Sequence, residues 1–202
     1  MLRSITVDDL HDIVEALSTA LDAKSVCMCG HSERVAEISR LLAKAMRLSP
    51  AEQTRIHIGA HLHDVGKIGI PDTVLSKPGK LTAAEYNIIR QHPEIGASIV
   101  GKVKALQAVV DIVRNHHERC DGRGYPDRLA GRDISLGARI VAVADAFDAM
   151  TSARSYRAAL GLPQAVDELR RWSGSQFDPE VVDALLTLIK EYRLPVFRPR
   201  PA

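Results

Sequence analysis

An adjacent histidine–aspartate pair, His63-Asp64, is the feature of this sequence with the clearest chemical meaning. In such a pair the imidazole can bind one metal ion while the carboxylate bridges to a second, and two bridged ions can activate a water for attack on phosphorus. Further histidines and one aspartate lie before and after this pair at intervals of about one helical hairpin, so the spacing predicts a polynuclear metal site in a helical bundle. In sequence order the candidate metal ligands are His31, His63, Asp64, His92, His116, His117 and Asp145.

A histidine taken alone is more often a surface or hydrogen-bonded residue than a metal ligand. Here five histidines and two aspartates fall at or near predicted helix ends, and this combination favours a metal site. His116 and His117 are adjacent, and adjacent side chains point to different sides of a helix, which indicates ligands for two ions. Nitrogen and oxygen donors without thiolate suit iron, manganese or zinc.

Four further residues, His11, His57, His61 and Lys67, could have a functional or a purely structural role. His11 is expected on a solvated helix face. His57 and His61 share a helix face at i, i+4 and could bind a metal on their own, but no zinc-protease glutamate accompanies them, which favours packing or a supporting role. Lys67, three residues after Asp64, could bind a substrate phosphate or protonate a leaving oxygen, or it could be an ordinary lysine at a helix C-terminus.

The bulk composition excludes several classes of protein. The 202 residues carry a net charge of +2, whereas nucleic-acid binders usually have a strong basic excess, so no DNA or RNA partner is expected. Aromatic residues make up 4%, which predicts an aliphatic core. Cys27, Cys29 and Cys120 are too few for a disulfide framework and favour a reducing cytoplasm. There is no apolar run of about 18 residues and no signal-peptide core at the start, so no membrane insertion is expected.

The apolar pattern predicts a chain that is nearly all helix. Residues 1–29 are expected to form an N-terminal helix that serves as a linker or dimer contact, residues 30–192 the main domain, and residues 193–202 a flexible Pro-rich tail. The predicted helices run from Thr6 or Asp8 to Ala23, from about His31, from Pro50 to near Gly66, from Thr82 towards His92, from Pro93, from Val103 to His117, from Leu136 to Met150, and from Pro163 and Pro179 onwards; residues 69–79 and 120–135 are predicted loops.

The ordered set of motifs, from about His31 to Leu186, resembles the HD-GYP subgroup of the HD-domain metal-dependent phosphohydrolases. The histidine–aspartate pair alone is a weak signal, but the whole set in this order is a strong one. The matching segments are His63-Asp64-Val65-Gly66-Lys67-Ile68-Gly69-Ile70-Pro71-Asp72, Lys77-Pro78-Gly79-Lys80-Leu81, His92-Pro93-Glu94-Ile95-Gly96, His116-His117-Glu118-Arg119, Asp121-Gly122-Arg123-Gly124-Tyr125-Pro126, Ala144-Asp145-Ala146-Phe147-Asp148-Ala149-Met150-Thr151-Ser152 and Phe177-Asp178-Pro179.

The resemblance implies an all-α fold, an HD-domain helical bundle with a C-terminal helical extension. It also implies a metal centre that hydrolyses cyclic di-GMP to pGpG, to GMP, or to both. Lys67 would stabilise the transition state or aid the leaving group, with Asp64 as the shared ligand. One ion would take His31, His63, Asp64 and Asp145, and the other would share Asp64 and take His92, His116 and His117.

Substrate contacts are implied in the same way. Tyr125, in the Gly124-Tyr125-Pro126 loop, would stack against a guanine base, although ordinary loop packing is the alternative. Arg154 and Arg157 would contact phosphate or base; their i, i+3 spacing could clamp an anion, or they could be a solvated helix end.

One difference between this sequence and the family pattern concerns the number of metal ions. Trinuclear members carry a glutamate where this chain has Cys27, which favours a binuclear centre. The expected ions are iron or manganese, with zinc, nickel and magnesium as further candidates. The resemblance also implies contact with diguanylate cyclase (GGDEF) domains through the Gly-Tyr-Pro loop, and a homodimer is a further expectation.

The complete ligand set favours an active enzyme. Two alternatives stay open at this point. One is a non-hydrolysing cyclic dinucleotide receptor or interaction module. The other is an HD phosphohydrolase that acts on cyclic GMP-AMP or another nucleotide.

Overall fold

The structure is a computed structural model that describes residues 6–24, 30–152, 159–191 and 194. All of the regular structure in these residues is helical, apart from an isolated bridge between Ser173 and Phe177. The predicted all-α class is therefore confirmed. The α-helices are α1 (Val7–Lys24), α2 (His31–Ala45), α3 (Pro50–Leu62), α4 (Asp72–Leu75), α5 (Ala83–Ile89), α6 (His92–Val100), α7 (Val110–Asn115), α8 (Leu136–Thr151), α9 (Leu162–Trp172) and α10 (Pro179–Lys190), and the 3₁₀ helices are η1 (Val65–Gly69), η2 (Lys104–Val109) and η3 (Gly131–Asp133).

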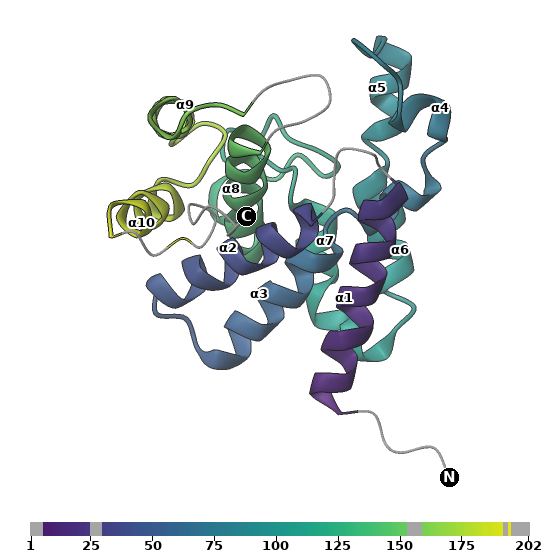
Figure 1. Ribbon diagram of the computed structural model, residues 1–202, viewed down its shortest axis with the longest axis horizontal. Helices are drawn as coiled ribbons and strands as arrows, with labels where there is room; N and C mark the ends of the chain where they lie inside the picture. Colours follow the sequence, from purple (N-terminus) through teal and green to yellow (C-terminus); the bar gives the residue numbers. More distant parts are fainter. Residues whose placement is uncertain (1–5, 25–29, 153–158, 192–193, 195–202) are drawn as a thin grey trace, which may run out of the picture.

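Helices α2, α3 and α8 form the centre of the fold, and α1 packs across α2 and α3 (Figure 1). Helices α9 and α10 cover α8 and α2 on one side as the C-terminal extension, while α4 and α5 project on the other side (Figure 1). The main core is largely aliphatic, as the composition predicts, with Phe147 and Phe177 as its buried aromatic residues. Helix α8 has no exposed residue from Leu136 to Met150, so it is buried or half-buried on all sides.

Several helix starts follow local sequence rules. Ser49 and Thr82 each form a capping box, with Glu52 and Glu85 respectively. The side chain of Asp178 caps α10, accepting a hydrogen bond from the backbone N–H of Glu180. These local signals predicted the starts of α3, α5 and α10 correctly.

Two predicted helices have the wrong extent. Helix α3 ends at Leu62 rather than near Gly66, and the chain then turns into the 3₁₀ helix η1. The span from Val103 to His117 is not one helix but η2 followed by α7, which ends at Asn115. In both places the ligand residues directly follow a helix end.

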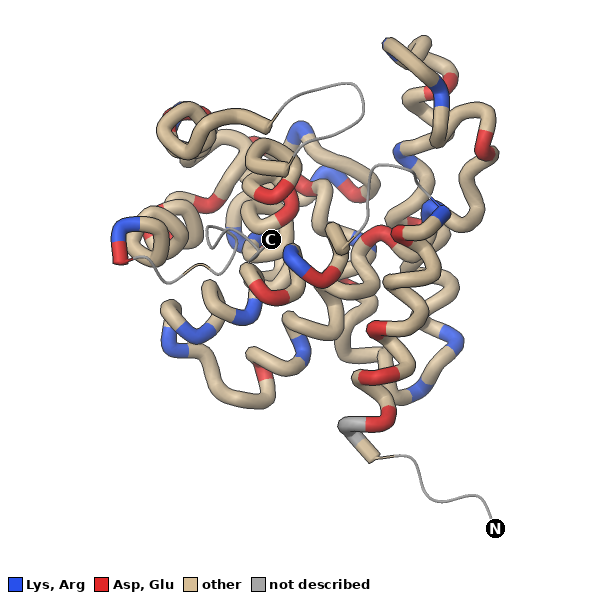
Figure 2. The backbone as a smooth tube through the Cα atoms, in the orientation of Figure 1, with Lys and Arg blue, Asp and Glu red and all other residues tan. Residues whose placement is uncertain are grey.

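Charged residues of both signs are distributed around the whole fold rather than gathered by sign on separate faces (Figure 2). Among the described residues, no helix is long and apolar enough to cross a membrane. Cys27, Cys29, Arg154, Arg157 and, apart from Leu194, the predicted tail 193–202 lie outside the described residues.

Candidate metal centre

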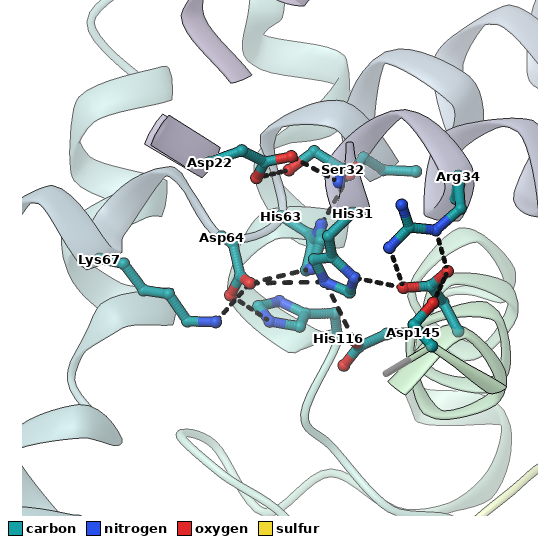
Figure 3. A network of polar contacts seen from close by, with 12 residues as sticks. Asp22, His31, Ser32, Arg34, His63, Asp64, Lys67, His116 and Asp145 are labelled. Carbon is teal, nitrogen blue, oxygen red and sulfur yellow. Dashed lines mark hydrogen bonds and ion pairs between the residues drawn. The ribbon is translucent and has the colours of Figure 1, made fainter. Parts of the chain in front are cut away.

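The seven predicted ligands come from five parts of the chain and converge on one place. Figure 3 shows five of them gathered together: His31, His63, Asp64, His116 and Asp145. Five of them are buried, and His117 and Asp145 are half-buried. Helix starts supply two histidines and helix ends supply three histidines and an aspartate, so the ligands are held by the rigid helical frame. His31 begins α2, His63 and Asp64 follow α3, His92 begins α6, His116 and His117 follow α7, and Asp145 lies within α8.

The two carboxylate oxygens of Asp64 face two different sets of side chains. Its Oδ2 lies 3.3 Å from Nε2 of His63 and 3.9 Å from Nε2 of His31. Its Oδ1 lies 3.2 Å from Nε2 of His92 and 4.0 Å from Nε2 of His116. Two groups of ligand atoms, each within 4.8 Å of one another, therefore share this one carboxylate: His31, His63 and Asp64 form one, and Asp64, His92, His116 and His117 form the other.

The polar atoms of this centre are better arranged to bind metal ions than to form hydrogen bonds with one another. Nε2 of His63 and Oδ1 of Asp64 are buried without a hydrogen-bond partner, which is costly unless a ligand satisfies them. Three of the histidines donate from Nδ1 to a backbone carbonyl: His63 to Ala60 at 2.6 Å, His92 to Ile89 at 2.8 Å and His116 to Val113 at 2.9 Å. This bond fixes the tautomer with the lone pair on Nε2, as in metal-binding histidines.

His31 is oriented by a residue that sequence reasoning did not assign. Its Nδ1 lies 2.7 Å from Oδ2 of Asp148, a buried carboxylate that also accepts from Arg34 Nε at 2.5 Å. Nε2 of His31 is thereby directed towards Asp145, whose Oδ1 is 3.4 Å away. Burial lowers the pKa of His31, but the hydrogen bonds to Asp145 and Asp148 outweigh it and raise the pKa to about 9. In the absence of a metal, a proton on His31 thus balances the carboxylates.

Two histidines of the second group, His116 and His117, are held neutral. Burial, with the neighbouring His117, keeps the pKa of His116 well below its usual value, and burial with His92 lowers the pKa of His117 to about 3. Metal ligation needs a deprotonated ring nitrogen, so both imidazoles are already in the form that binds a metal.

The expectation that His116 and His117 serve different ions is wrong on the geometry. Their ring centroids are 4.1 Å apart, and both belong to the group around Oδ1 of Asp64 and His92. The argument from opposite helix sides fails because α7 ends at Asn115, so neither histidine lies inside a helix.

Lys67 lies beside Asp64, where its predicted catalytic role requires it, but it is not part of an α-helix. It is part of η1, and its Nζ is 2.5 Å from Oδ2 of Asp64. Burial raises the pKa of Asp64, but Lys67 and His63 outweigh it and hold the pKa well below its usual range. The carboxylate is therefore ionised and able to bind cations.

A cavity of about 560 Å³ opens beside the centre, and His116, His117 and Asp145 form part of its wall. Gly124 and Tyr125 of the predicted substrate loop also line it. The Arg90 guanidinium lies 4.6 Å from the centroid of the Tyr125 ring, and the His117 ring centroid is 4.9 Å from it. A base that stacks on Tyr125 must therefore share this ring with Arg90 or displace it.

Sequence reasoning missed several contributors to this site. Arg90 and Arg123 line the cavity, and Asp22 of α1 accepts from the backbone N–H and hydroxyl of Ser32, next to His31, at 3.1 and 2.7 Å. The one available signal was Asp148, which follows Asp145 by one helical turn. The other contacts join residues far apart in the chain and leave no local pattern.

Known proteins resemble this chain in sequence and in fold. A family model described as "HD domain" matches residues 15–181. A cyclic di-GMP phosphodiesterase of Thermotoga maritima is 43% identical over 186 residues, 91% of this chain and 50% of that protein. A 3'3'-cGAMP-specific phosphodiesterase 2 of Vibrio cholerae is 41% identical over 177 residues, 87% of this chain and 34% of that protein.

The fold has a solved counterpart as well. A cyclic GMP-AMP-specific phosphodiesterase of V. cholerae superposes with a TM-score of 0.70 at 21% identity, over 92% of this chain and 50% of that one. The chain thus spans half or less of the length of each of these three proteins.

Proposed function

The chain belongs to the HD-domain family, and on that premise we propose that it is a metal-dependent phosphodiesterase in bacterial second-messenger signalling. Its proposed reaction is hydrolysis of cyclic di-GMP to pGpG, to GMP, or to both. The observation that carries the proposal is the position of Asp64, whose two oxygens face two sets of histidines beside a cavity. The name of the Thermotoga relative supports the substrate.

The seven ligands would hold two ions with Asp64 as the bridge. His31, His63 and Asp145 complete one set, and His92, His116 and His117 complete the other. Two ions held there would supply Lewis acidity and would activate a water for attack on phosphorus. Iron or manganese is the proposed native metal, with zinc, nickel and magnesium as further candidates, and the nitrogen and oxygen donors of the seven ligands are compatible with this choice.

The chain's own residues would bind and orient the dinucleotide. Arg90 and Arg123 line the cavity and offer guanidinium groups to phosphate or to a guanine edge. Tyr125 offers an aromatic face, and Lys67 lies next to Asp64 where it can stabilise charge on the leaving oxygen. Arg154 and Arg157 belong to the same proposal through their match to the family motif.

The proposal extends to the rest of the chain. Residues 30–192 would form the phosphohydrolase unit, with residues 1–29 as a helix that links or pairs copies and residues 193–202 as a tail. The loop around Gly124-Tyr125-Pro126 would be the contact for a diguanylate cyclase domain, through its exposed flanking residues Arg123 and Arg128. The small number of cysteines favours a cytoplasmic site of action.

A second substrate is favoured by a specific observation. The Vibrio relative named for 3'3'-cGAMP is 41% identical to this chain, close to the 43% of the Thermotoga protein. Identity therefore does not separate the two dinucleotides, and the experiment must include both.

The test is a hydrolysis assay on protein purified without oxygen and loaded separately with Fe(II) and Mn(II). Metal per chain is measured, and cyclic di-GMP and cyclic GMP-AMP are incubated with the protein while products are followed by chromatography. We expect pGpG or GMP to appear from cyclic di-GMP. Bound metal without product from either dinucleotide would reject the cyclic dinucleotide phosphodiesterase and favour a receptor or an enzyme that acts on another phosphoester.

Replacing Lys67 with glutamine tests its proposed catalytic role. We expect kcat to fall about a hundredfold or more, which is the usual contribution of a positioned proton donor, while the metal content stays unchanged. Lys77→Gln is the matched control, because Nζ of Lys77 also pairs with a carboxylate, that of Glu85 at 2.8 Å, away from the centre. Equal activity of both variants would instead assign Lys67 the role of a helix-end lysine.

A further inference from the structure

The three histidines that the metal centre does not use lie together between α1 and α3. His57 and His61 are one turn apart on α3, and His11 reaches them from α1. Nε2 of His11 is 2.9 Å from Nε2 of His57, and the His57 and His61 ring centroids are 4.7 Å apart. The expectation that His11 is solvated is therefore wrong: its half-buried ring stacks on His57 at a centroid distance of 5.0 Å.

The side-chain hydrogen bonds in this three-histidine cluster resemble those of the main centre. Nδ1 of His57 donates to the carbonyl of Ala36 at 3.1 Å, just as His63, His92 and His116 use Nδ1 on backbone carbonyls. The Ser18 hydroxyl donates to the Glu15 carbonyl, so Nδ1 of His61, 3.3 Å away, is the donor to Ser18. Both α3 histidines thus keep the lone pair on Nε2, the arrangement found in metal-binding histidines.

The surroundings also favour a metal ion. One ring nitrogen from each of the three histidines lies within 4.8 Å of the other two. A cavity of about 380 Å³ adjoins His11 and His57, which leaves room for a further ligand. Burial lowers the pKa of His57, so its ring is neutral at ordinary pH. Three imidazoles and an open position make up one of the common protein sites for Zn²⁺.

We propose that His11, His57 and His61 form a second metal site, separate from the Asp64 centre, that takes Zn²⁺ or a similar divalent ion and clamps α1 onto α3. The clamp has a consequence for the main centre. Asp22, further along α1, accepts both the N–H and the hydroxyl of Ser32, which directly follows the ligand His31. An ion on the three-histidine cluster would therefore stabilise the helix that holds the first turn of α2.

The test counts zinc ions on the tag-free full chain in an Asp64→Asn background, which weakens the main centre. After equilibration with Zn²⁺ and removal of free metal, zinc per chain is measured by mass spectrometry. We expect His11→Gln and His57→Gln, added singly, each to remove about one ion per chain and to abolish part of the zinc-dependent rise in Tm. The two substitutions lie on different helices, so misfolding of one variant alone cannot explain loss of zinc from both. Circular dichroism verifies that each variant is folded.

The matched control is the double substitution Asp12→Asn and Glu15→Gln. These exposed carboxylates on α1 could form an alternative site with His11, and we expect the control to keep the ion. Equal zinc content in the parent and in both histidine variants would overturn the proposal and leave His11 and His57 as a hydrogen-bonded pair. Loss of the ion in the control would overturn it too. Neither outcome depends on the phosphodiesterase assay.

Discussion

Replacing Asp64 with asparagine is expected to release metal from both ligand sets and to reduce hydrolysis at least about a thousandfold. The carboxylate is the one group shared by both sets, and Asn offers a single neutral oxygen in place of two anionic ones. A metal ion stabilises a phosphoryl transition state by several kcal/mol, and each 1.36 kcal/mol is tenfold in rate. Metal per chain and kcat are the two measurements.

Asp178→Asn is the matched control for Asp64→Asn. Asp178 is also a buried carboxylate with a cationic partner, Arg139, but it caps α10 away from the ligand sets. We expect that control to lose some stability and to keep both ions. If Asp64→Asn retained two ions and the parent rate, Asp64 would not be the bridge and the proposed centre would be wrong.

Gly66→Ala is expected to destabilise the fold by about 3 kcal/mol or more and to weaken metal binding. A Cβ at Gly66 would lie 1.9 Å from the carbonyl oxygen of His92 and 2.5 Å from the backbone nitrogen of Gly96. Backbone atoms cannot swing aside as a side chain can, so η1 and α6 must separate. The movement would displace His92, a ligand, from Asp64.

The measurement for Gly66→Ala is thermal unfolding together with metal content. For a chain of this size about 3 kcal/mol corresponds to a Tm lower by roughly 6–12 °C. Gly161→Ala is the control, since its φ of −61° suits alanine and the atoms nearest to its Cβ are the side chain of Gln164 and the ring of Pro163. A Gly66→Ala protein as stable as the Gly161→Ala control would show that the two elements are less tightly packed than described.

Local sequence signals predicted the helices and their starts well. The capping boxes at Ser49 and Thr82 and the prolines at positions 50, 93, 163 and 179 each mark a helix start that the structure has. These signals work because a capping side chain satisfies N–H groups only two or three residues away. The helix ends at Leu62 and Asn115 were missed, because neither glycine nor proline directly follows these residues in the sequence.

The candidate ligands were all selected from the sequence, because histidine and aspartate at hairpin spacing are chemically distinctive. Their grouping was only partly accessible. The packing of α3, α6 and α7 decides that the Asp64 carboxylate faces two separate sets of histidines. The same packing places the rings of His116 and His117 in one of these sets. The spacing of residues along the chain does not predict how these helices pack against one another.

By itself, the sequence determined the helical class, the aliphatic core and the set of candidate metal-binding side chains, because each depends on residue type and short-range spacing. Only the tertiary structure decided which side chains support them. Four contacts join side chains from different structural elements: Asp148 orients His31, Asp22 of α1 holds Ser32, Arg90 lies over Tyr125, and His11 stacks on His57. Such contacts form when helices pack, and their geometry is a property of the packed chain rather than of any segment within it.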